Sequence, residues 1–175
     1  RSIVLDLKKA SHKAALLALC DKADVFVENM RAGVMDDLGL GYEIMAESNP
    51  EIIYACVRGF GDPRTGSSPY VDWPCLDAAA QSFGGLVYAN DGLVTPAIAD
   101  IFPGTLMALG VVSAVHHARR TGEGQFLDVS MYDAMMAFQK SAVAQYGFTR
   151  KPNPPGLQRA MTLYPFDLFP TKDGR

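Results

Sequence analysis

Short, mostly apolar runs alternate with segments of mixed polarity over residues 1–60 of the chain. The runs Ser2–Leu7, Asp24–Asn29 and Ile52–Val57 predict three strands, because buried parallel strands are apolar along most of their length. Between them, the pattern predicts a helix that begins after an N-cap at Ser11, a short helix between Gly33 and Gly39, and another helix over Tyr42–Ser48. This order of elements predicts an α/β fold with a parallel, doubly wound (Rossmann-like) sheet and flanking helices.

The rest of the chain opens with a loop and then becomes largely helical. Gly59–Trp73 is dominated by Gly, Pro, Ser, Thr and Asp, a composition that predicts a loop. Beyond it the pattern predicts a helix over Leu76–Phe83, a turn at Asn90–Gly92, a long apolar helix from Phe102 or Pro103 to Arg120, a strand over Gln125–Val129 and a helix over Tyr132–Tyr146. From Lys151 the sequence Lys-Pro-Asn-Pro-Pro-Gly is typical of a linker.

The composition is that of an ordinary globular protein. Of the 175 residues, 49% are apolar and 20% are charged, and the net charge of −3 gives no reason to expect a nucleic-acid partner. The cysteines Cys20, Cys56 and Cys75 form no metal-binding spacing, so we expect no metal. Without a signal segment or an uninterrupted apolar span, we expect a cytoplasmic protein with no membrane partner. The chain starts at Arg1 rather than Met, which suggests a piece of a longer protein.

One carboxylate stands out from its apolar surroundings. Asp100 is the single charged residue between Ala97 and Val115, where a buried unpaired carboxylate would cost several kcal/mol. Two interpretations remain open from the residues alone, a helix cap and a catalytic nucleophile. Other chemistries find little support, because the chain has no Gly-rich phosphate-binding motif and no nucleophile-elbow motif. His116 and His117 lie inside the apolar helix, where surface or satisfied histidines are the ordinary case.

Several motifs in order resemble one known family. The stretches RSIVLDLK, ADVFVENMRAGVMDDLGLGYE, NPEIIYACVRGFG and RRTGEGQFLDVSMYDAM together resemble the class III CoA-transferases, the CaiB/BaiF family. That family includes formyl-CoA transferase, carnitine CoA-transferases and α-methylacyl-CoA racemase. The resemblance runs from Arg1 to about Phe148, and YPFDLFPTKDGR resembles the family's segment before a second domain. It implies a partial large domain over 1–148, then a linker and the start of a second, smaller domain over 149–175.

The resemblance also implies a chemistry. Asp100 and Gly104 match the family's D-x-x-x-G context, in which the aspartate is the nucleophile. The implied function is transfer of CoA from an acyl-CoA donor to a carboxylic acid acceptor through an aspartyl anhydride and an aspartyl-CoA thioester. The implied cofactor is coenzyme A, bound as the acyl-CoA substrate. The family forms interlocked dimers, so a homodimer is expected of the complete protein.

Coenzyme A contacts are carried over from the same motifs. The implied CoA-binding residues come from three segments: Leu5 and Lys8, with Lys8 at a phosphate; Asn29, Met30 and Arg31, near the pantetheine and adenosine; and Pro74, Cys75, Leu76 and Asp77, beside the thioester. The chain departs from formyl-CoA transferase at Asp37, where that enzyme uses a basic residue, and one phosphate contact is therefore in doubt.

Two alternatives to a transferase stay open. Racemases of the family carry a Gly-His-Asp motif whose histidine removes the α-proton, and the corresponding residues here are Cys75, Leu76 and Asp77. Leu76 cannot exchange a proton, so a two-base racemase mechanism lacks one base. The other alternative is a fragment that binds CoA or dimerises without turnover.

Overall fold

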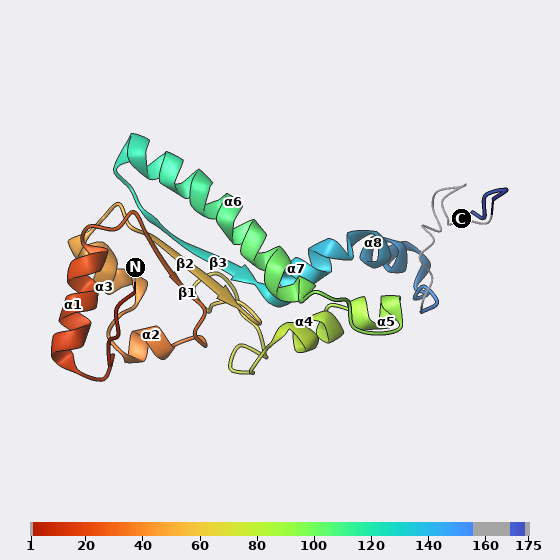
Figure 1. Cartoon of the computed structure of the whole chain (residues 1–175), viewed down its shortest axis with the longest axis horizontal. Helices are drawn as coiled ribbons and strands as arrows, with labels where there is room; N and C mark the ends of the chain where they lie inside the picture. The colour runs from red at the N-terminus through yellow and green to blue at the C-terminus, as the bar shows by residue number, and fades with distance from the viewer. Residues whose placement is uncertain (1, 156–168, 174–175) are drawn as a thin grey trace.

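The chain folds around a small parallel sheet with helices on both faces, as shown in the computed structural model of Figure 1, which describes residues 2–155 and 169–173. The strands, in the spatial order β1-β2-β3, are β1 (Val25–Glu28), β2 (Ile53–Arg58) and β3 (Gln125–Ser130). β2 pairs in parallel with both neighbours, and Tyr54 lies opposite Phe26 on one side and Phe126 on the other. The predicted parallel α/β fold is confirmed.

Helices account for most of the remaining chain. They are α1 (Ala10–Cys20), α2 (Val34–Asp37), α3 (Tyr42–Ser48), α4 (Asp77–Phe83), α5 (Leu86–Asn90), α6 (Ile98–Thr121), α7 (Met131–Phe138) and α8 (Lys140–Thr149). The bounds of α3 are those predicted, whereas α5 was not predicted at all. The single helix predicted over Tyr132–Tyr146 is wrong, because the chain leaves the helical conformation at Gln139 and divides it into α7 and α8.

Alternate side chains of β2 point to opposite faces of the sheet, as the pleat of a strand requires. Tyr54 and Cys56 pack with buried residues of α1–α3, among them Cys20 and Met45. Ile53 points the other way and packs against Ala114 and Ala118 of α6, together with Val25 and Leu127 from the neighbouring strands. Figure 1 shows the corresponding layers, with α6 along one side of the sheet and α1–α3 on the other. The sheet is therefore covered on both faces, as a doubly wound fold requires.

The long apolar helix α6 begins earlier than its sequence predicts. It starts at Ile98 rather than Phe102 or Pro103, so Pro103 is an interior residue and its side chain is buried. A helix of this length and composition would also be able to cross a membrane. However, core helices of globular proteins pass the same test, and α6 packs on β2, β3, α4 and α7. The absence of a membrane partner stays a prediction.

The N-terminal segment differs most from its prediction. Residues 2–6 form neither a strand nor a helix, so the strand predicted over Ser2–Leu7 is wrong. Ile3 and Val4 are 64% and 95% exposed, and an apolar run without a neighbouring strand to pair with does not form a strand. The predicted N-cap is also wrong, because α1 already begins at Ala10 and Lys9, not Ser11, occupies the cap position.

The predicted boundary near residue 148 falls close to the end of α8 at Thr149. Residues 151–154 are in neither helix nor strand, in keeping with the predicted linker. The predicted start of a second domain falls mostly on residues 156–168 and 174–175, which lie outside the described residues. The two-domain division therefore stays a prediction.

Candidate active site

The three parallel strands end at one edge of the sheet, and a cavity of about 580 Å³ opens there. Ligands of open α/β sheets bind at this edge, because the loops after the strands diverge and leave a crevice. The lining residues come from the ends of β1 and β2 and the loops after them, from the 71–76 segment, from α6 and from the start of α7: Val27, Glu28, Asn29, Met30, Arg31, Ala32, Val57, Arg58, Gly59, Val71, Trp73, Cys75, Leu76, Asp100, Gly104 and Met131.

Asp100 reaches this cavity from the first turn of α6. Its side chain is exposed rather than sealed in the core. Partial burial and, secondly, the negative charge of Asp77 raise the pKa of its carboxyl above the ordinary value of 3.8. The free N–H groups of the helix N-terminus act in the opposite direction and favour the carboxylate by about 0.3–1 kcal/mol. Asp100 therefore combines an accessible carboxylate with surroundings that make it more basic than usual.

Asp77 holds the start of α6 in place. It is the first residue of α4, and its Oδ1 accepts a hydrogen bond from the Ala99 N–H at 2.9 Å, while Oδ2 accepts one from Gln81 Nε2 at 2.8 Å. Gln81 is fully buried and makes two further hydrogen bonds to the backbone of Val94. The residue next to Asp100 is thus fixed by a charge-assisted hydrogen bond from a neighbouring helix. Asp77 itself does not line the cavity.

Cys75 and Leu76 lie at the cavity wall beside Asp100. The segment that carries Cys75 can lie this close to the end of β2 only because residue 59 is a glycine. A Cβ atom at residue 59 would stand 2.1 Å from the Cβ of Cys75. Burial and the charge of Asp100 raise the pKa of the Cys75 thiol above its usual 9.0, which keeps it protonated at neutral pH. The Leu76 side chain is 79% exposed, so it presents apolar surface at the mouth of the cavity.

The turn after β1 supplies another part of the wall. Asn29, Met30 and Arg31 all line the cavity, and Arg31 is an exposed cation at that wall. Glu28 and Arg58, which end β1 and β2, also line it although they are buried. These two residues, together with Trp73 and Met131, were not predicted from the sequence. A charged residue that ends an apolar strand was the available signal for Glu28 and Arg58.

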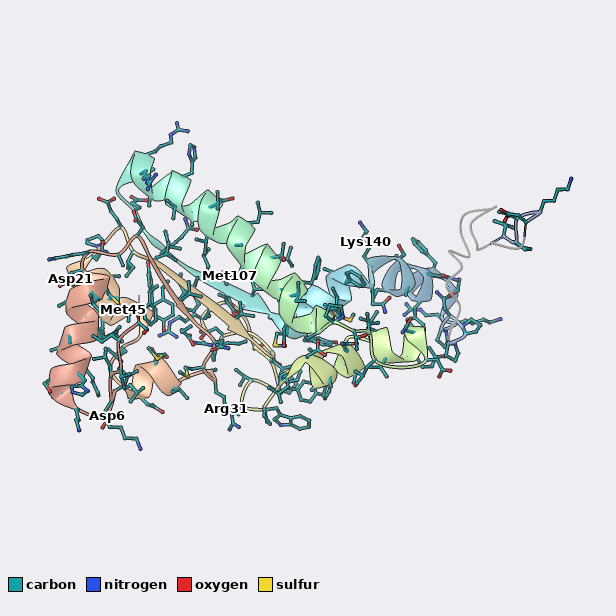
Figure 2. All side chains as sticks on the ribbon, in the orientation of Figure 1. Asp6, Asp21, Arg31, Met45, Met107 and Lys140 are labelled. Carbon is teal, nitrogen blue, oxygen red and sulfur yellow. The ribbon has the colours of Figure 1, made fainter. Side chains whose placement is uncertain are left out.

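The remaining predicted contacts lie away from the cavity. Leu5 and Lys8 do not line it, and the Lys8 N–H donates to Asp6 Oδ1 in the turn before α1. Figure 2 shows Asp6 beside α1, apart from Arg31 at the end of the sheet. Pro74 precedes the lining residues without lining the cavity itself. Contacts of Leu5, Lys8 and Pro74 with CoA stay predictions.

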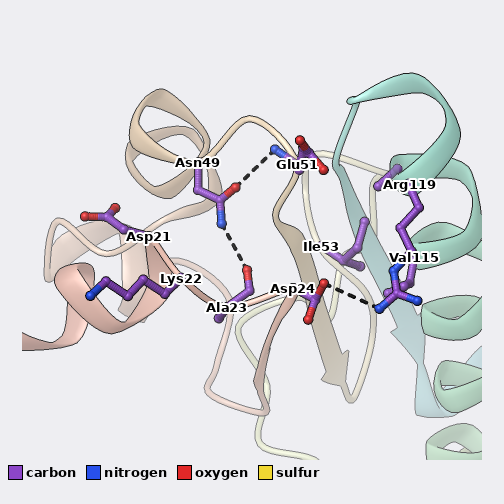
Figure 3. A pocket seen from close by; sticks show the side chains of 10 residues that line it. Asp21, Lys22, Ala23, Asp24, Asn49, Glu51, Ile53, Val115 and Arg119 are labelled. Carbon is purple, nitrogen blue, oxygen red and sulfur yellow. Dashed lines mark hydrogen bonds and ion pairs between the residues drawn. The ribbon is translucent and has the colours of Figure 1, made fainter.

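A second, smaller cavity of about 200 Å³ lies at the opposite edge of the sheet (Figure 3). It is lined by residues such as Asp24, Ile53 and Arg119, at the beginnings of β1 and β2 and the end of α6. None of the predicted site residues lines it. In the described part of the chain, no group of three or more His, Cys, Asp or Glu side chains is arranged to hold a metal ion.

The fold and the cavity together define an α/β protein with a cavity at the carboxyl ends of its strands and an accessible carboxylate in that cavity. The family model for CoA-transferase family III matches residues 1–175. The chain belongs to this family, as the resemblance of its motifs implied.

Named relatives agree with this assignment. The chain is 42% identical over 181 residues to the succinyl-CoA:mesaconate CoA-transferase of Haloarcula hispanica, an alignment that covers 99% of the chain and 46% of that enzyme. It is 38% identical over 179 residues to the acetyl-CoA:oxalate CoA-transferase of Acetobacter aceti, covering 98% of the chain and 45% of the enzyme. The crystal structure of a CAIB/BAIF family protein from Brucella suis superimposes with a TM-score of 0.80 at 30% identity, covering 89% of the chain and 42% of that protein. The chain therefore spans less than half the length of these relatives.

Proposed function

We propose that this chain carries the nucleophile and part of the CoA site of an enzyme that transfers CoA from an acyl-CoA donor to a carboxylic acid. The observation that carries the proposal is the place of Asp100, an accessible carboxylate of raised pKa at a helix N-terminus inside the cavity. The CoA-transferase names of the relatives support the same reaction class. By those names, succinyl-CoA with mesaconate and acetyl-CoA with oxalate are the substrate pairs to test first.

In the first half-reaction, an Asp100 carboxylate oxygen attacks the carbonyl carbon of the donor thioester. The C–S bond breaks, which leaves a mixed anhydride on Asp100 and a CoA thiolate. The thiolate then attacks the aspartyl carbonyl carbon and expels the donor acid as a carboxylate. The product is an aspartyl-CoA thioester, so the energy of the thioester bond stays on the enzyme.

The second half-reaction runs the same steps in reverse. The acceptor carboxylate attacks the aspartyl thioester and releases the CoA thiolate, which gives a second anhydride. The thiolate attacks the acceptor carbonyl carbon, forms the new acyl-CoA and returns Asp100 to a carboxylate. Apolar side chains at the cavity, including Val57, Leu76 and Met131, support the proposal because anhydrides must be protected from water.

A racemase reaction is less well supported by the same cavity. Inversion at the α-carbon needs a proton acceptor on each face of that carbon. Leu76 offers none, and both carboxylate oxygens of Asp77 already accept hydrogen bonds, from Ala99 and Gln81. Asp100 would therefore have to act without a second base.

We further propose that the complete protein is a homodimer. Support comes from the outer side of α6, where Ile101, Leu109 and Val112 are 51%, 67% and 69% exposed. Apolar residues exposed in a row on a helix are typical of surfaces that other protein covers. Sedimentation velocity of the complete gene product should give the mass of a dimer, and a monomer at micromolar concentration would contradict this part of the proposal.

The reaction is tested by incubating the complete gene product with succinyl-CoA and mesaconate, or with acetyl-CoA and oxalate, and separating the CoA esters by chromatography. We expect a new CoA ester that requires both substrates. Asp100→Asn should abolish its formation, whereas Asp91→Asn, a change at an exposed turn outside the cavity, should not. Free acid and free CoA as the sole products would indicate a hydrolase and would contradict the proposal.

A further inference from the structure

A buried ion pair joins the ends of β1 and β2 at the wall of the cavity. Arg58 Nη2 donates to Glu28 Oε1 at 2.5 Å, and each side chain is 4% exposed. Glu28 is the last residue of β1 and Arg58 is the last residue of β2. Both line the cavity that also contains Asp100, although neither was among the predicted contacts with CoA.

The other oxygen of Glu28 holds the turn that follows β1. The Met30 N–H donates to Glu28 Oε2 at 2.6 Å, so one carboxylate bridges the Arg58 guanidinium and the backbone of Met30. The turn has little packing of its own, since Asn29, Met30 and Arg31 are all exposed. Its position therefore depends on the Glu28 carboxylate.

Arg58 extends the connection to the third strand. It also forms an ion pair with Asp62, whose side chain is completely buried. The Asp62 N–H in turn donates to Asp128 Oδ2 of β3 at 2.8 Å. The carboxyl ends of β1, β2 and β3 are thus linked by charged groups on the side of the sheet that carries the cavity.

Stability alone is a weak reason to bury these charges. Removing ions from water costs about as much as their attraction returns, and apolar replacements of similar size are often neutral or stabilising. In addition, Arg58 Nε has no hydrogen-bond partner among the described residues, which is an uncompensated cost. The ion pair does fix the position of the turn after β1, because one carboxylate oxygen of Glu28 accepts from Arg58 and the other from the Met30 N–H.

We propose that Glu28 and Arg58 are positioning residues for CoA, which act by holding the Asn29–Arg31 turn in its binding conformation without touching the reacting atoms. The inference rests on the proposed function, since it takes the cavity to be the CoA site. It predicts that weakening the bridge raises the Kd for CoA and the KM for the acyl-CoA donor, while kcat at saturating donor is nearly unchanged. A purely structural role would lower the melting temperature without this division between KM and kcat.

The test uses Glu28→Gln in the complete gene product, with Glu43→Gln as the matched control. In glutamine an NH2 group replaces one of the two carboxylate oxygens, so either Arg58 or the Met30 N–H faces a donor instead of its acceptor. Glu43 also pairs with an arginine, Arg64, but it is exposed and lies outside the cavity. We expect Glu28→Gln to raise the Kd for CoA by about tenfold or more, as for the loss of one hydrogen bond to a charged group. Glu43→Gln should leave it within about twofold, as for an exposed pair.

Three outcomes are informative. A folded Glu28→Gln variant with unchanged Kd and KM overturns the inference but leaves the proposed function intact. Wild-type protein that binds no CoA in a calorimetric titration overturns the proposed function and the inference with it. If Glu28→Gln does not fold, Glu28→Asp decides, because it keeps the buried charge but is one methylene too short to bridge Arg58 and Met30. An unchanged Kd for Glu28→Asp contradicts the inference.

Discussion

Replacing Gly59 by alanine should change the position of Asp100 in the cavity while leaving the residue itself unchanged. The new Cβ would stand 2.1 Å from the Cβ of Cys75, and ordinary contact begins at 3.4 Å, so the two segments must part by about 1.3 Å. Cys75 is two residues from Asp77, which holds the N-terminus of α6 through the Ala99 N–H. The displacement therefore acts on the segment that positions Asp100.

A misplacement of about 1 Å at a reacting group costs about a hundredfold in rate, so we expect kcat of Gly59→Ala to fall by about that factor. The loss of stability should be only about 1–3 kcal/mol, as for overpacking elsewhere in proteins. The assay is CoA transfer with saturating substrates, alongside thermal unfolding. Gly66→Ala is the matched control, because a Cβ there meets nothing within 4 Å. A folded Gly59→Ala variant with kcat within twofold of wild type would show that the approach of Gly59 to Cys75 does not position Asp100.

Four further predictions concern single residues. Asp100→Ala should lower the transfer rate by several orders of magnitude while the far-UV circular dichroism is unchanged, and a rate within tenfold of wild type would make Asp100 a cap. The Asp100 carboxylate must be ionised to attack, so kcat/KM should fall as the pH falls through the raised pKa of Asp100. Asp77→Asn removes a charge that raises this pKa and should move the fall in kcat/KM to lower pH. An unchanged pH profile would contradict this role of Asp77. Because Leu76 cannot accept a proton, the protein should not exchange the α-proton of a 2-methylacyl-CoA for deuterium in D₂O, as followed by NMR. Rapid deuterium uptake with inversion at the α-carbon would favour a racemase. Lys8→Ala should raise the Kd for CoA and reduce its salt dependence. A Kd equal to that of the wild type at both a low and a high ionic strength would exclude a phosphate contact of Lys8.

The sheet and the helices that cover it were predictable where the signal is local. β1 and β2 are apolar runs, and α3 ends directly before Asn49-Pro50, so its bounds follow from the sequence. The strand over Ser2–Leu7 failed because a strand needs a neighbour to pair with, and an apolar pattern does not reveal one. The predicted start of α6 was wrong for a similar reason. The Ala99 N–H in its first turn donates to Asp77, which lies 22 residues earlier in the chain and cannot be found from the local pattern.

The candidate site was predictable to a smaller extent. Asn29–Arg31, Cys75, Leu76 and Asp100 do meet at one cavity, but the prediction that groups them came from a family resemblance and not from their spacing. Glu28 and Arg58 were missed because charged residues at strand ends are usually solvated. Their burial results from the pairing of β1 with β2, a contact between residues 30 positions apart.

Asp100 is proposed to form a covalent thioester with CoA, and this thioester can be trapped chemically. The complete gene product would be mixed with acyl-CoA donor alone, quenched with hydroxylamine, digested and analysed by tandem mass spectrometry. We predict a hydroxamate at Asp100, absent from Asp100→Asn and absent when CoA is supplied without its acyl group. Transfer of CoA between acids with no modification of Asp100, or with modification at another residue, would contradict the account.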